Sequence, residues 1–247
     1  MKNIKKYNFS KVYDLQNSSR TAFYKKILFP KATKNIWSST ETTLPEGTTK
    51  EDFDKDSVLS RFDYQLKSSG INTNHTLKPD FSWSTTDISQ IKNHHQLDKY
   101  ILIFPFCSPH LTSKKWPYYN ELISMIDEKS DNKFKVVVAP GPNEIKEASN
   151  INALCVLDNG KALDISQLAT LIKGSSFVIA NDTGPAHMTA HLGSKGIVLF
   201  GSHTTPFKEV LKEKILKQYK LLKYLNSQQK KFLKDFLKLF LNFFNYS

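Results

Sequence analysis

The sequence predicts a doubly wound α/β fold built on a parallel sheet, and the observations that predict it lie in the second half of the chain. Between residues 99 and 206, short apolar runs alternate with helical segments of about ten residues. The stretch 175–206 is the clearest unit, because it reads strand, tight turn, helix, tight turn and strand. A unit of this length requires two parallel strands joined by a right-handed crossover.

In this half, Gly, Pro and small polar residues separate the apolar runs and indicate where each element ends. Pro185 suits the first position of a helix, and Gly193 suits its C-cap. We expect strands at 100–106, 134–139, 177–180 and 196–200. We expect helices at 118–127, 144–149, 164–173 and 185–192.

The patterns of the first half, residues 1–98, are weaker. A Ser- and Thr-rich stretch predicts a loop at 38–50, and the polar residues 82–97 are interpreted as a domain linker or a surface helix. The remaining predicted elements are a strand at 11–16, a helix at 18–29 with Ser18 or Ser19 as N-cap, a short strand at 35–37 and a helix at 54–69.

The turn at 181–184 is where we expect the chemistry. Open parallel sheets bind ligands beyond the carboxyl ends of their strands. A helix N-terminus begins at this end, and its free N–H groups and positive dipole favour a phosphate or diphosphate. Gly184 lets a ligand approach the backbone, Thr183 offers a hydroxyl, and His187 lies one turn further on. Asp182 would repel phosphate, so we interpret it as a turn organiser or a partner for sugar hydroxyls or His187.

The composition predicts a globular protein that does not span a membrane, because no run of about eighteen apolar residues occurs. No apolar segment follows the basic first residues, so we expect no signal peptide. Cys107 and Cys155 lack CxxC spacing and are interpreted as buried thiols of a reducing compartment. Residues 208–247 hold ten lysines and three acidic residues, a net charge of +7 out of +12 for the chain. The basic character therefore belongs to the tail, and we expect no nucleic-acid partner.

The motif in this turn resembles that of a known family. It reads Asn181-Asp182-Thr183-Gly184-Pro185-x-His187, followed by Leu199-Phe200-Gly201. This pattern is similar to the signature of the glycosyltransferase family 9 heptosyltransferases, which build the inner core of bacterial lipopolysaccharide from ADP-heptose. The resemblance covers roughly residues 11–206 and includes VYDLQNSSR, Ser108-Pro109-His110 and Lys114-x-Trp116-Pro117.

The resemblance implies a GT-B-like architecture with a Rossmann-like C-terminal domain and a truncated N-terminal α/β domain. The family places its proposed catalytic base, an aspartate, in a Gly-rich turn upstream of the matched region. We therefore expect the base to be absent from this chain and assign no catalytic residue. The expected domains are 1–98, a partial acceptor-side domain with a linker; 99–225, the nucleotide-sugar-binding domain; and 226–247, a basic amphipathic helix.

Resemblance and chemistry together assign the donor-binding residues. Lys114 occupies the family position that contacts the donor diphosphate, where an ammonium stabilises the leaving group; its other interpretation is a solvated surface lysine. Glu144 can accept ribose hydroxyls, although glutamates also favour the first turn of a helix for dipole reasons alone. Ser108 could equally be a turn N-cap. The full set is Ser108, His110, Lys114, Glu144, Asp182, Thr183, Gly184 and His187.

We expect neither a metal nor a cofactor. His187 and His191 stand four residues apart, but no HExxH pattern and no third ligand accompany them. The favoured interpretation is one ligand-side and one packing histidine. The resemblance implies metal-independent chemistry in which the ADP-sugar is a substrate.

The implied function is transfer of a heptose or related sugar from an ADP-sugar to a lipopolysaccharide core acceptor, a lipid-linked saccharide. The alternative is a catalytically impaired remnant that binds the nucleotide sugar without the base. Either protein would be cytoplasmic, at the inner face of the inner membrane. The tail, 228–244, carries phenylalanines at helical spacing between lysines. It can be read as a helix on an anionic membrane surface or, preferably, as a helix packed on the protein.

Overall fold

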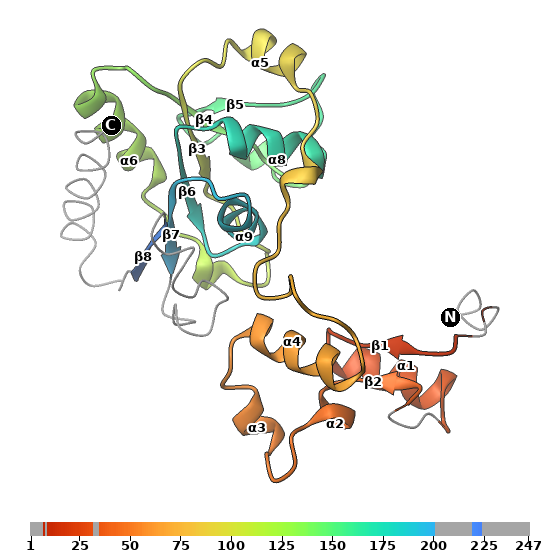
Figure 1. Cartoon of the computed structure of the whole chain (residues 1–247). Coiled ribbons are helices and arrows are strands. Elements are labelled where there is room, and N and C mark those ends of the chain that lie inside the picture. Colours follow the sequence, from red (N-terminus) through yellow and green to blue (C-terminus); the bar gives the residue numbers. More distant parts are fainter. Residues whose placement is uncertain (1–6, 8, 32–34, 201–218, 224–247) are drawn as a thin grey trace. The chain divides into compact units, whose positions relative to one another are not determined.

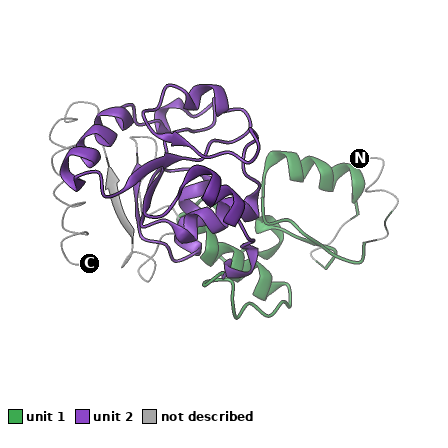
Figure 2. Cartoon of the chain, turned by 90° about the horizontal axis from the view of Figure 1, so that it is seen from above, with its two compact units in different colours: residues 1–79, 207–210 green, residues 80–206, 211–247 purple. Residues whose placement is uncertain are grey.

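The computed structural model describes residues 7, 9–31, 35–200 and 219–223 (Figure 1). The chain divides into two compact units, of which the first comprises Met1–Pro79 and the second begins at Asp80 (Figure 2). The predicted amphipathic helix at 226–247 lies outside the described residues. None of the described helices is long and apolar enough to cross a membrane.

The first unit contains a pair of short parallel strands, β1 (Val12–Tyr13) and β2 (Trp37–Ser38). Helix α1 (Ser19–Leu28) connects them. Ser18 is the N-cap of α1, as one of the two alternatives predicted, and it forms a capping box with Thr21. Each strand is shorter than its apolar pattern suggested.

Three more helices complete this unit: α2 (Thr40–Thr43), α3 (Lys50–Phe53) and α4 (Val58–Ser68). The loop predicted at 38–50 is therefore partly wrong. Thr42 Oγ1 accepts the Ser39 N–H at 2.9 Å and so stabilises a single helical turn within the Ser- and Thr-rich stretch. Gln65 of α4 is buried, and its amide donates to the carbonyls of Asp14 (3.0 Å) and Ser38 (3.1 Å), which ties α4 to the ends of both strands.

The second unit is built on a six-stranded sheet in which every neighbouring pair is parallel, with the order β5-β4-β3-β6-β7-β8. This is the strand order of the dinucleotide-binding doubly wound fold. The order reverses between β3 and β6, which is the topological switch point. The strands are β3 (Tyr100–Phe104), β4 (Lys135–Val138), β5 (Leu154–Cys155), β6 (Phe177–Asn181), β7 (Gly196–Phe200) and β8 (Tyr219–Lys223).

Helices cover both faces of this sheet (Figure 1). One core contains Leu102, Val178 and Val198 with apolar residues of α5 (Ser89–His95), α8 (Ile165–Gly174) and α9 (Gly184–His191). The opposite core contains the alternate strand residues with α6 (Tyr119–Ser130) and α7 (Ile145–Ala148). Successive side chains of a strand point to opposite faces of the sheet, so each buried strand contributes side chains to both cores.

The unit boundary differs from the predicted division at residue 98. Residues 80–98 pack in the second unit, because Ile88 and Ile91 are buried in its core, and Thr170 of α8 exchanges two hydrogen bonds with the backbone of Thr86. This segment contains the short 3-10 turn η2 (Ser82–Ser84) and α5. Because the segment is mostly polar, its two buried isoleucines were not recognised as core residues from the sequence.

Strand β8 was not predicted from the sequence, because its residues lie in the Lys-rich tail. Its backbone pairs with β7 in parallel over five residues, from Gly196–Tyr219 to Phe200–Lys223. Pairing with an existing strand overrides a weak local preference for helix.

Candidate functional site

A cleft of about 300 Å³ opens in the second unit at the carboxyl ends of β3, β4 and β6, beside the switch point. Parallel sheets of this order bind their ligands at this place. The residues that line the cleft are Phe104, Phe106, Cys107, Ser108, Ala139, Pro140, Gly141, Glu144, Leu163, Leu168, Thr183, Gly184 and Pro185.

The cleft has an apolar wall and a polar rim. Phe104, Ala139 and Leu168 belong to the core beneath it, so its floor is continuous with the packed interior. The rim comes from the turns that follow the three strands, which break the strands with Pro or Gly. A flat apolar group with a polar extension fits such a lining.

Helix α9 begins at the rim. Thr183 is its N-cap in extended conformation, and the Thr183 carbonyl accepts the N–H groups of Ala186 (3.0 Å) and His187 (3.3 Å). The Thr183 hydroxyl donates to the Asn181 carbonyl at 3.3 Å and does not cap the helix. Gly184 is exposed in the cleft, and nothing lies within 4 Å of the position that a Cβ atom would take there. A ligand can therefore approach the positive end of α9 closely.

Lys114, Asp182 and His187 form a cluster of ionisable side chains next to this helix N-terminus. The carboxylate of Asp182 is 2% exposed, and its Oδ2 lies 2.7 Å from Lys114 Nζ. The same ammonium donates to the Asp182 carbonyl at 3.1 Å. His187 Nε2 lies 3.8 Å from Asp182 Oδ1. The prediction that Asp182 would organise the turn or contact His187 thus has a structural basis, and Lys114 is not a freely solvated lysine.

Glu144 lies on the opposite rim, before α7. Its Oε2 accepts the Gly141 N–H at 2.8 Å, so the carboxylate folds back over the turn after β4. A Cβ atom at Gly141 would lie 3.2 Å from this oxygen, which makes the glycine part of the arrangement. The contact fixes one carboxylate oxygen in the cleft wall.

Of the remaining predicted residues, one lies in the cleft and one does not. Ser108 lines the cleft, and its carbonyl accepts the Leu111 N–H at 2.8 Å in the turn after β3. His110 is exposed in the same turn and is not among the residues that line the cleft. The structure thus brings Ser108, Glu144, Thr183 and Gly184 to one cleft, with the Lys114–Asp182–His187 cluster at the N-terminus of α9.

Sequence reasoning missed two features of this site. One is the apolar wall, whose residues come from three separate segments. The other is Cys107, interpreted only as a buried thiol. It is half-buried at the cleft, donates from Sγ to the Leu111 carbonyl at 3.3 Å, and has a pKa raised by burial. Its position directly after the predicted strand 100–106 was the available signal.

His191 packs away from the rim, near the end of α9. Its ring centroid lies 5.3 Å from that of Phe81, and burial lowers its pKa. Within the described residues, no group of three or more His, Cys, Asp or Glu side chains is placed to hold a metal. The absence of a metal from the reaction stays a prediction.

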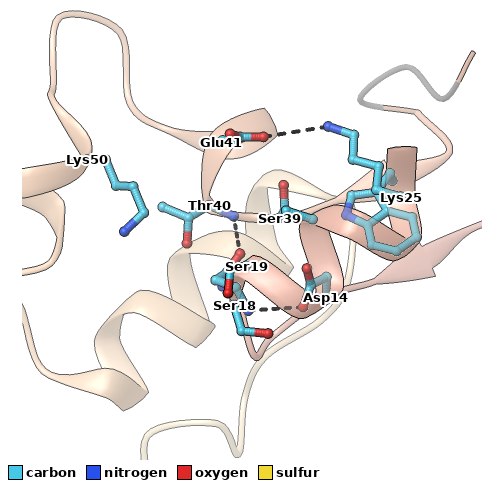
Figure 3. Close-up of a pocket in the computed structure, with 11 residues that line it drawn as sticks. Asp14, Ser18, Ser19, Lys25, Ser39, Thr40, Glu41 and Lys50 are labelled. Atoms are coloured by element: carbon cyan, nitrogen blue, oxygen red, sulfur yellow. Dashed lines mark hydrogen bonds and ion pairs between the residues drawn. The ribbon is translucent and has the colours of Figure 1, made fainter. Parts of the chain in front are cut away.

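The first unit has a polar cleft of its own, of about 200 Å³ (Figure 3). It lies at the carboxyl ends of β1 and β2, beside the N-terminus of α1. Lys25 and Glu41 face one another across it at 3.7 Å. Asp14 is 8% exposed, and its Oδ1 accepts the Asn17 N–H at 3.0 Å. The other lining residues are Asn17, Ser18, Ser19, Ala22, Trp37, Ser39, Thr40 and Lys50.

The sequence matches glycosyltransferase family 9 (heptosyltransferase) over residues 1–234. Since this match spans most of the chain, the protein belongs to that family. A search of curated proteins found no match.

Solved structures of the same family share the fold. E. coli heptosyltransferase WaaC with ADP superposes with a TM-score of 0.63 at 18% identity, over 98% of this chain and 77% of that one. A family 9 glycosyl transferase from Veillonella parvula superposes with a TM-score of 0.63 at 15% identity, over 92% of this chain and 66% of that one. E. coli ADP-heptose lps heptosyltransferase II superposes with a TM-score of 0.56 at 14% identity, over 91% of this chain and 71% of that one. The predicted α/β, GT-B-like fold class is confirmed.

Proposed function

We propose that this protein transfers a heptose or a related sugar from an ADP-sugar to a lipopolysaccharide core acceptor. The observation that carries the proposal is the cleft at the switch point of a family 9 chain, with the N-terminus of α9 and the Lys114–Asp182 pair beside it. WaaC, which shares the fold, has been solved with ADP and with ADP-2-deoxy-2-fluoro heptose. These neighbours support a nucleotide-sugar donor.

The proposed donor lies across the cleft. Its diphosphate sits at the N-terminus of α9, where Gly184 leaves room against the backbone. As the bond between the sugar and the diphosphate breaks, negative charge grows on the leaving oxygen. The helix dipole and the Lys114 ammonium stabilise that charge, which is the main contribution this unit makes to the reaction. Ser108 offers a hydroxyl group to the phosphate oxygens, and the Thr183 hydroxyl does so when it turns away from the Asn181 carbonyl.

The nucleoside lies toward β4 in this arrangement. The apolar wall of Leu163, Leu168 and Ala139 accepts the base, and Glu144 accepts hydrogen bonds from the ribose hydroxyls. The Gly141 N–H occupies Glu144 Oε2, so Oε1 is the oxygen assigned to the ribose. Asp182 and His187 are assigned to the sugar side of the diphosphate.

The acceptor saccharide is assigned to the cleft of the first unit. Its lining mixes carboxylates, hydroxyls and lysines, a combination suited to a sugar that carries anionic groups (Figure 3). Lys50 is one of its cations and also pairs with Asp54 at 2.5 Å. Lys50→Ala is expected to raise KM for the acceptor and to leave KM for the donor unchanged. In this proposal, the protein binds both substrates at the cytoplasmic face of the inner membrane.

Two measurements test the proposed function. Calorimetry with ADP and 2′-deoxy-ADP should show a preference for ADP, and Glu144→Ala should remove that preference. A transfer assay with ADP-heptose and a heptose-deficient core acceptor should then show product. Failure of ADP to bind would refute the donor assignment. Binding without transfer would support the alternative, a protein that binds the nucleotide sugar and does not use it.

A further inference from the structure

Asn181, the last residue of β6, is fully buried, although it is a polar residue in the core of the sheet. Its side-chain Nδ2 donates to the Pro105 carbonyl at 2.8 Å. Its Oδ1 accepts the Trp116 backbone N–H at 3.4 Å and lies 3.2 Å from the Tyr119 hydroxyl, whose single proton is shared with the Phe104 carbonyl, also at 3.2 Å. One amide therefore joins the end of β6 to two segments that lie more than sixty residues earlier in the chain.

These partners belong to the segments that supply the donor cleft. Pro105 follows β3 directly and precedes the cleft residues Phe106, Cys107 and Ser108. Trp116 follows Lys114 by two residues, and its side chain is 1% exposed in the core. The two segments are held against the end of β6, and the next residue in the chain is Asp182, the partner of Lys114.

Asparagine is the side chain that fits this position. Pro105 offers only a carbonyl acceptor, whereas Trp116 and Tyr119 offer donors, so the central group must donate on one side and accept on the other. An aspartate would place a carboxylate oxygen at the Pro105 carbonyl. An apolar residue would leave the Pro105 carbonyl and the Trp116 N–H without this partner in the interior, which is costly.

Not every buried polar side chain of this unit links distant segments. Thr189 is also fully buried, but its hydroxyl donates to Pro185, four residues earlier in α9. Such a bond stabilises one helix. The bonds of Asn181 instead link the end of β6 to both segments that carry predicted donor-binding residues.

We propose that Asn181 is a positioning residue for the donor site, acting through Lys114 and Ser108. Its amide fixes the turn at 105–108 and the segment at 114–116 against β6. Lys114 is thereby held where its ammonium meets Asp182 at 2.7 Å and the N-terminus of α9. This inference rests on the proposed function, because it assigns a role within the same donor site.

The first test follows the backbone and needs no ligand. Amide hydrogen exchange is measured for Asn181→Ala and for Thr189→Val, a matched buried control within α9. Asn181→Ala is expected to accelerate exchange at 106–116 by about tenfold or more relative to the control, because these amides lose an anchor. Equal exchange of this segment in both variants would overturn the proposal. Asn181→Ser is used for the same measurement if the alanine variant does not fold.

The second test measures whether Asn181 acts through Lys114. ADP affinity is compared for the wild type, Asn181→Ala, Lys114→Ala and the double variant. Asn181→Ala should weaken binding about tenfold in the wild-type background and by less than about threefold when Lys114 is absent, because coupled residues are non-additive. Thr189→Val should bind ADP as the wild type does. Fully additive effects, or unchanged affinity in Asn181→Ala, would overturn the positioning role.

The outcomes separate this inference from the proposed function. If the wild type does not bind ADP, the proposed function fails, and hydrogen exchange alone decides whether Asn181 anchors the two segments. If the wild type binds ADP and Asn181→Ala binds it equally well, the proposed function stands and the inference fails.

Discussion

Lys114 Nζ contacts Asp182 twice, at 2.7 Å from Oδ2 and at 3.1 Å from the backbone carbonyl. The carboxylate is 2% exposed and the lysine side chain 20% exposed, so this ion pair is screened little by solvent. Both residues come from segments that end at the cleft, one after β3 and one after β6. The pair therefore holds a cation at the N-terminus of α9 before any ligand binds.

Removing this cation should weaken binding of ADP. Lys114→Ala is expected to cost roughly 1–3 kcal/mol in ADP affinity, the scale of a charge-assisted hydrogen bond. It should also lower the free energy of unfolding, because it leaves Asp182 buried without its lysine. Lys115→Ala is the matched control, since Lys115 pairs with Glu147 on the surface. Calorimetry and chemical denaturation check both effects, and equal ADP affinity in the two variants would refute the assignment of Lys114 to the diphosphate.

Two glycines should respond in opposite ways to the same substitution. Gly184→Ala adds a methyl group with nothing within 4 Å, so stability should change by less than about 0.5 kcal/mol while ADP affinity falls. Gly174→Ala places its Cβ 2.9 Å from the Tyr100 hydroxyl, which is held by the Leu171 carbonyl. This variant should lose roughly 1–3 kcal/mol of stability through overpacking and keep its intrinsic ADP affinity. Thermal melts and calorimetry on both variants test the pattern, which a loss of stability without loss of affinity in Gly184→Ala would contradict.

The two cysteines provide a probe of where ADP binds. Burial raises the pKa of both thiols, so alkylation by iodoacetamide should be slow at pH 7 and accelerate as the pH rises. Only Cys107 lines the cleft. ADP should therefore slow alkylation of Cys107 and leave the rate at Cys155 unchanged, as followed by mass spectrometry. Protection of both thiols to the same extent would indicate a global effect and not occupancy of the cleft.

His191 should make stability depend on pH. Burial, followed by the charge of nearby His187, lowers its pKa below the ordinary value of 6.5 in the folded state. The unfolded chain then binds more protons between the two pKa values, so stability is full above about pH 6.5 and falls as the pH is lowered through that value. His191→Gln should flatten this dependence in denaturation curves measured from pH 8 to pH 5. A slope that is unchanged in His191→Gln would show that another group titrates.

The region 175–200 could be predicted well from the sequence because its information is local. Apolar runs define β6 and β7, Pro185 lies at the start of α9, and Gly193 follows the helix with a φ of 70°. The motif residues that line the cleft follow from the same turn. Alternating strands and helices were sufficient to predict a parallel sheet, and the family resemblance was sufficient to predict its class.

Features built from distant contacts could not be predicted. The anchoring of α4 by Gln65 depends on carbonyls 51 and 27 residues away, and no pattern within the helix indicates them. Strand β8 exists through its pairing with β7, and the role of Asn181 depends on partners in two other segments. Sequence reasoning treated Asn181 as part of a turn, whereas it closes a network inside the core.

Two of the turns at the cleft of the second unit carry proline where the chain leaves a strand: Pro105 after β3 and Pro140 after β4, with Pro185 in the first turn of α9. A proline ring fixes the backbone φ angle, so these segments have little conformational freedom left to lose. A nucleotide would therefore bind to turns that are already ordered, and the entropic cost of ordering these turns on binding would be small. Differences in affinity among ADP analogues should then reflect the contacts that each analogue gains or loses. The contribution of an individual contact to the binding free energy could therefore be measured at this cleft.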